Sequence, residues 1–135
     1  MSASLALQTA LFAALAADTS VQAALGDPPR LYDSVPRAPV FPYATLGGAT
    51  ETDWSTKTEA GSEHRFTLTV WSRASGHKES KDIAATLIDA LDNAIIAPEG
   101  HALVSLRFED AMHARETDGI TTRATLRYRA VTEPV

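Results

Sequence analysis

The sequence predicts an α+β fold: a mainly antiparallel sheet with two helices packed on one face and a C-terminal β-hairpin. The hydrophobic period changes once, from two residues to about four, between Phe66 and Leu91, which predicts a strand followed by a helix. An alanine-rich amphipathic segment opens the chain, and an Asp-Gly pair separates two alternating segments near its end. With 135 residues, of which 44% are apolar, we expect one domain over residues 1–135.

The first helix is expected over residues 4 to 17, because its leucines fall on one face and alanine favours helix. A signal peptide is the alternative, but no Lys or Arg precedes this apolar run and Gln8 and Thr9 interrupt it. A short second helical turn from Ser20 to Leu25 should start at a capping box and end at Gly26. The capping box is formed by Thr19 and Gln22.

Short strands are expected next, at residues 31–33 and 43–46, because the prolines between them exclude longer ones. Gly47-Gly48 should close the second of these strands, and a weaker strand is expected over residues 50–58. The central strand, residues 64–73, follows a polar turn.

In the central strand Phe66, Leu68 and Val70 alternate with polar residues, so one face should be buried. The helix after it, at about residues 78–94, carries an apolar stripe through Ile83 that is wide enough to lie across a sheet.

The C-terminal hairpin is expected to pair a strand from residue 103 to about 115 with a returning strand over residues 120–131. Asp118-Gly119 between them predicts a type I′ turn, because both residues tolerate positive φ. The last four residues should form a mobile tail.

Composition excludes several kinds of chemistry. The net charge of −5 argues against a general nucleic-acid binder, and the lack of cysteine removes disulfides and thiolate sites. The four histidines have no metal-binding spacing, and neither a phosphate loop nor a Gly-x-Ser-x-Gly elbow is present. Glu109 and Asp110 are adjacent on a strand and should point to opposite faces unless a bulge intervenes. We therefore expect a soluble protein that is not an enzyme and has no cofactor and no metal.

Two features of the face that the helix leaves uncovered are candidate contact sites. Trp71 should lie on this face, buried either by a second layer of the same chain or by another subunit. Arg123, Arg127 and Arg129 share one face of the last strand, which is either a solvated surface or a binding strip. Acidic stretches of the chain are possible partners for the strip, and they contain Glu51, Asp53, Glu59 and Glu63.

Trp54 is a further candidate, because it is the one tryptophan of a polar, glycine-rich segment over residues 47–62. Such a segment buries too little surface to order itself alone. We expect its tip to be an extended hairpin or loop that orders against a neighbouring subunit or another protein, with Trp54 as anchor. In the alternative, Trp54 folds back onto its own core.

The order of several motifs resembles the tail-completion (tail terminator) proteins of long-tailed phages and gene transfer agents. These motifs are Leu31-Tyr32-Asp33-Ser34-Val35-Pro36, Phe41-Pro42-Tyr43-Ala44, Phe66-Thr67-Leu68-Thr69-Val70-Trp71-Ser72, the helix from Ile83 to Leu91, and Asp118-Gly119-Ile120-Thr121-Thr122 with Leu126-Arg127-Tyr128-Arg129. The resemblance implies a ring, usually of six subunits, that sits on the last ring of the tail tube, stops tube polymerisation and offers a surface to the head connector.

The partners implied by this resemblance are other copies of the chain, the tail tube protein and the head-tail connector protein. No membrane and no sequence-specific nucleic acid is expected, although DNA would pass through the ring. Assembly would take place in the host cytoplasm, and the protein would end in the virion, at the head-proximal end of the tail. A monomeric small-ligand-binding or enzymatic α+β domain stays open as the alternative, and it should contain a pocket with convergent polar groups.

Overall fold

A five-stranded sheet in the order β1-β2-β3-β5-β4 forms one layer of the computed structural model, which describes all residues from Met1 to Val135. Only β1 and β2 are parallel, and the other neighbouring strands are antiparallel. The predicted α+β class with a C-terminal hairpin is therefore confirmed. The strands are β1 Leu31–Tyr32, β2 Tyr43–Asp53, β3 Ser62–Ser72, β4 His101–Arg115 and β5 Thr122–Pro134.

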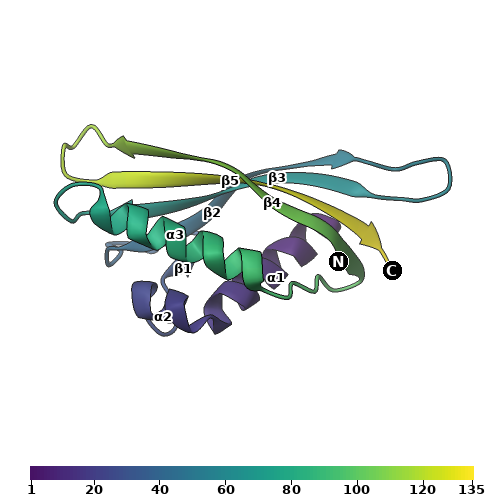
Figure 1. Cartoon of the computed structure of the whole chain (residues 1–135), viewed down its shortest axis with the longest axis horizontal. Helices are drawn as coiled ribbons and strands as arrows, with labels where there is room; N and C mark the ends of the chain where they lie inside the picture. Colours follow the sequence, from purple (N-terminus) through teal and green to yellow (C-terminus); the bar gives the residue numbers. More distant parts are fainter.

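All three helices, α1 (Ala3–Ala17), α2 (Thr19–Leu25) and α3 (Lys78–Asn93), lie on the same side of the sheet (Figure 1). Their buried leucines and isoleucines join the inward residues of the strands in one apolar core. This confirms the helical stripes and the alternation that the sequence shows. No single helix is long and apolar enough to cross a membrane; α1 and α2 together pass by length and composition but are bent by 83°. The core residues of β3 and α3 are Phe66, Leu68, Val70, Ile83, Ala84, Leu87, Ala90 and Leu91.

The start of α2 differs from the prediction. Asp18 is its N-cap, and its carboxylate accepts hydrogen bonds from the backbone N–H groups of Ser20 and Val21 at 2.9 and 3.0 Å. Thr19 is already the first helical residue, so the expected capping box was wrong by one position. Gly26 ends the helix as predicted, with φ of 98°, which favours glycine.

Strand β2 is longer than expected, and the prediction that Gly47-Gly48 closes it was wrong. The ladder with β3 passes through a bulge between Gly47 and Thr50 and continues to Asp53. The weaker strand expected over residues 50–58 is therefore present only over residues 50–53, as the second half of β2, and residues 54–58 lie in the loop that follows. The positive φ of Gly48, 60°, fits a bulge position. Glycine here bends the strand without ending it, because β3 still supplies hydrogen-bond partners.

The hairpin of β4 and β5 is confirmed, but its turn is not type I′. Only Gly119 has positive φ, and β5 starts at Thr122 instead of Ile120. The Asp118 carboxylate accepts hydrogen bonds from the N–H groups of Ile120 and Thr121, both at 2.8 Å, and from the Thr121 hydroxyl at 2.7 Å. These bonds lower the pKa of Asp118 to about 2 and stabilise a wider loop.

The tail that was expected to be mobile belongs to β5 as far as Pro134. Thr132 is buried and pairs with residues of both neighbouring strands, Leu103 and Ser62. The backbone N–H of Val135 donates to the carbonyl of Gly100 at 3.1 Å. The sequence gives no sign of this pairing, because the partners are supplied by strands distant in the chain.

Candidate functional site

The face of the sheet opposite the helices carries most of the residues singled out from the sequence. Strand register aligns its side chains in rows across β2, β3, β5 and β4. One row is rich in threonine, and the rows on either side contain the arginines and Trp71. From β2 to β4 the rows read Tyr43-Trp71-Arg123-Ala114, Thr45-Thr69-Thr125-Met112, Gly47-Thr67-Arg127-Asp110 and Thr50-Arg65-Arg129-Arg107.

The three candidate arginines of β5 lie on this face as predicted, and each is paired with a carboxylate of its own chain. Arg129 binds Glu63 at 2.7 Å, Arg127 lies 3.3 Å from Asp110, and Arg123 is paired with Glu116. Of the acidic residues considered as partners, only Glu63 takes this role. The strip is therefore largely neutralised within the subunit, and phosphate binding would have to compete with these ion pairs.

A β-bulge gives the adjacent pair Glu109 and Asp110 a common direction. The register of β4 against β5 shifts between Phe108 and Asp110. As a result the Glu109 carboxylate lies 3.3 Å from Arg65, while Asp110 reaches Arg127 on the same face. Both carboxylates are thus held by arginines of the neighbouring strands.

Trp71 is half-buried on the uncovered face and has partners within its own chain. Its ring stacks on Tyr43 with centroids 6.4 Å apart, and its indole N–H donates to the Thr45 hydroxyl at 3.2 Å. Tyr43 in turn contacts the rings of Tyr32 and Phe41, and burial raises its pKa although Arg73 opposes the rise. This aromatic cluster occupies one end of the face and leaves part of Trp71 open to another molecule.

Trp54 lies at the other end of the β2–β3 ladder, just after the last paired residue, Asp53. It is 47% exposed, and its backbone N–H donates to the carbonyl of Gly61 at 2.9 Å. A Cβ at Gly61 would lie 3.4 Å from the indole, so the ring lies beside this glycine. Trp54 therefore does not fold into the core, and the structure does not bring it together with Trp71.

The outer edge of β4 is a feature that sequence reasoning missed. This fifteen-residue strand pairs only with β5, so the backbone groups of its other edge have no partner strand. It also exposes Val104, Phe108 and Met112, three large apolar side chains. The strand itself was predicted, but only the order of strands in the sheet places it at an edge.

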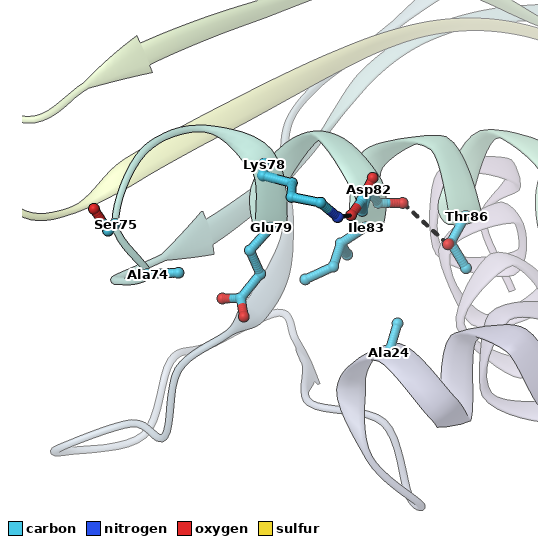
Figure 2. A pocket seen from close by; sticks show the side chains of 8 residues that line it. All are labelled: Ala24, Ala74, Ser75, Lys78, Glu79, Asp82, Ile83 and Thr86. Carbon is cyan, nitrogen blue, oxygen red and sulfur yellow. Dashed lines mark hydrogen bonds and ion pairs between the residues drawn. The ribbon is translucent and has the colours of Figure 1, made fainter.

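The largest surface hollow, about 440 Å³, lies between α2, the start of α3 and the loop before α3 (Figure 2). Its polar groups bind one another: Lys78 extends along α3 to Asp82 at 2.5 Å, and Glu79 accepts from the Ser72 hydroxyl at 2.8 Å. No nucleophile with an adjacent base lines it, and no group of three or more potential metal ligands occurs in the chain. The hollow lacks the convergent polar groups that a ligand-binding or catalytic domain should have.

Comparison with known proteins gives a consistent result. Residues 9–133 match the family described as "Tail completion protein gp17". The protein of that description from Bacillus phage SPP1 is 26% identical over 89 residues, which is 66% of either chain. Among solved structures, a chain of the "Virion of native gene transfer agent (GTA) particle" is 34% identical, with a TM-score of 0.84 and 96% of both chains covered. The bacteriophage SPP1 gp17 structure shares the fold at 23% identity, with a TM-score of 0.65 over 95% of this chain and 89% of that one.

Proposed function

Because this chain belongs to the tail completion protein gp17 family, whose members are structural proteins of phage tails, we propose that it acts as a tail terminator. We expect six copies of the chain to close into a ring, and this ring sits on the last ring of the tail tube. The ring stops tube polymerisation and joins the tail to the head connector. Its partners are other copies of itself, the tube protein and the connector protein, and its final place is the head-proximal end of the tail.

The openness of the sheet at both edges is the observation that carries this proposal. β1 covers only Ala44 and Thr45 of β2, so the rest of that edge is free, as is the outer edge of β4. β2 and β4 run in opposite directions within the sheet. In a ring of equally oriented copies, β4 of one copy and β2 of the next would therefore meet as antiparallel strands, which supports a head-to-tail arrangement.

The character of the uncovered face supports the proposal that DNA passes through the ring without being bound by it. The three arginines of β5 and Arg65 are bound by carboxylates, Arg107 alone of the aligned arginines is not, and the central row consists largely of threonines. Such a surface offers few free cations to phosphates. We also propose that the protein performs no enzymatic turnover, in agreement with the self-paired polar groups of its largest hollow.

Tube assembly in vitro tests the proposal. Purified protein is added to polymerising tube subunits, and tube lengths and end structures are measured by electron microscopy. We expect shorter tubes that carry a ring at one end. A chain that stays monomeric in light scattering and leaves tube length unchanged would favour the ligand-binding alternative.

Trp54 is the residue we propose as an anchor of this assembly, because it is half-exposed at the start of the loop that joins β2 to β3. This hairpin extends beyond the helices (Figure 1). Trp54→Ala should leave the melting curve of the monomer nearly unchanged, abolish capping, and let tails grow past their normal length. Lys57→Ala, in the same loop, is the matched control and should cap normally. Normal capping by Trp54→Ala, or failure of that variant to fold, would refute the anchor.

A further inference from the structure

A groove runs along α3, between this helix and the pair formed by α1 and α2. It consists of three adjoining hollows of about 440, 220 and 280 Å³. The first, in which Ala24 and Ile83 approach each other from α2 and α3 (Figure 2), shares Thr86 with the second. The second and third share Asp18, Ala90 and Asn93. The three hollows are thus neighbours along α3, and we call them together the groove.

The groove combines a floor of small apolar residues with an acidic rim. Alanines of all three helices line it, so another backbone can approach closely. Among the rim carboxylates, Asp82 and Asp89 are seven residues apart on α3 and therefore lie on the same side of the helix. No Lys or Arg occurs in residues 1–29 or 82–100, and Lys78, the one basic lining residue, is already bound by Asp82. The groove therefore suits an apolar segment that carries a positive charge.

The chain itself presents such a segment between β1 and β2, which we call the proline loop (residues 34–40). Val35 and Val40 are 42% and 64% exposed, and Arg37 forms none of the ion pairs of the structure. Prolines 36 and 39 restrict the loop, so little conformational entropy remains to be lost on docking.

Two contacts fix the loop at its end. Arg30 donates to the carbonyl of Pro42 at 2.8 Å, and the guanidinium of Arg73 lies 4.3 Å from the centre of the Phe41 ring. These contacts hold the end of the loop that contains the Val-Pro motif, while Val35 and Val40 are exposed to solvent.

We infer that the groove along α3 receives the proline loop of the neighbouring copy, with Arg37 bound by Asp89, a rim carboxylate that forms none of the ion pairs of the structure, and the valines on the alanine floor. The inference rests on the proposed ring of copies and names the surfaces that join them. Groove and loop are different parts of the chain, so each copy gives one and receives one. Repeated in one direction, such a contact continues from copy to copy, as a ring requires, whereas a reciprocal exchange between two copies would give a two-fold dimer and only linked dimers on cross-linking.

Cysteine cross-linking in assembled tails tests the contact directly, because the chain has no cysteine of its own. The double variant Arg37→Cys with Asp89→Cys is incorporated into tails and oxidised. We expect a ladder of disulfide-linked copies on a non-reducing gel, and none with either single variant. If the double variant is incorporated into tails but migrates only as a monomer on the non-reducing gel after oxidation, the inference is overturned.

Charge reversal provides a second test. It can be used even if the cysteine variant is not incorporated into tails. Arg37→Glu and Asp89→Arg should each lower incorporation about tenfold or more, and the two together should restore it. Glu99→Arg, at an exposed carboxylate outside the groove, is the control and should incorporate normally. A combined variant no better than the single ones overturns the inference.

Other results separate this inference from its premise. If tails carrying wild-type protein show a terminal ring and both single reversals incorporate normally, the ring stands and the groove contact is wrong. If only Asp89→Arg fails, a basic segment of a different virion protein occupies the groove, and the proline loop does not. If wild-type tails show no ring in electron micrographs, the proposed function fails together with the inference.

Discussion

The two faces of β3 differ in what they do for the molecule although they alternate residue by residue. Phe66, Leu68 and Val70 are buried under the helices, whereas Thr67 and Thr69 between them are only half-buried. The inner face removes apolar surface from water and so drives folding. The outer face has its polar groups paired across strands and contributes little to folding, so it is available for contacts with other molecules.

The largest expected effect comes from placing a charge under the sheet. Ile83→Asp buries an unpaired carboxylate at a position that is 5% exposed, which costs several kcal/mol out of about 5–15 for a whole domain. We expect loss of the cooperative melting transition in circular dichroism. Ala85→Asp, on the exposed side of the same helix, should melt almost like the wild type. Equal melting of both variants would contradict the assignment of the buried stripe.

Truncation of neighbouring residues on β3 compares the two faces within one strand. Leu68→Ala should lower the free energy of unfolding by about 2–5 kcal/mol, because it leaves a cavity in the core. Thr69→Ala on the outer face should cost less than about 1 kcal/mol. Urea denaturation of both variants gives the difference. Similar losses would mean that the outer face carries more of the stability than its exposure indicates.

Acid titration of a buried histidine is a smaller test. His64 is buried with its Nε2 2.8 Å from the Thr132 hydroxyl, and burial lowers its pKa, with a further lowering from His101 that Glu51 opposes. The unfolded chain therefore binds the proton more readily. Stability should be constant above a pH of about 6.5 and should fall as pH drops below that value.

Melting temperatures between pH 7.5 and pH 5 measure this effect in the wild type and in His64→Gln. The variant should lose most of the pH dependence in this range, whatever its absolute stability. His113→Gln is the control: His113 is exposed on β4, and its pKa is lowered by partial burial and by Lys81 and His77. If His113→Gln removes more of the slope than His64→Gln, the buried histidine is not the source.

The smallest effects are expected among the ion pairs of the outer face. The side chains of Arg129 and Glu63 are 24% and 19% exposed, and those of Arg127 and Asp110 are 53% and 55% exposed. Double-mutant cycles should give about 0.5–1 kcal/mol for the first pair and nearly zero for the second. A second pair as strong as the first would show that this face is shielded from solvent more than its exposure implies.

Periodicity in the sequence predicted the central strand, the helix after it, the N-terminal helix and the hairpin, because each of these segments carries its own apolar pattern. The face of β5 with Arg123, Arg127 and Arg129 was predicted for the same reason. Local signals were less reliable at the ends of elements. Gly47-Gly48 and Asp118-Gly119 each contain a glycine with positive φ, as their sequences indicate. Pairing with β3 decided that β2 continues past Gly47-Gly48, and hydrogen bonds to the Asp118 side chain decided the shape of the turn after β4.

The sequence by itself therefore determined which segments are helices and strands and which of their faces are apolar. Only the tertiary structure decided that Glu63, Asp110 and Glu116 neutralise the arginines, that β4 is an open edge, and that a groove follows α3. Local pattern depends on residues a few positions apart, whose geometry the backbone fixes. Ion pairs, sheet edges and grooves depend on the distances between residues far apart in the chain, and those distances exist only once the core has formed.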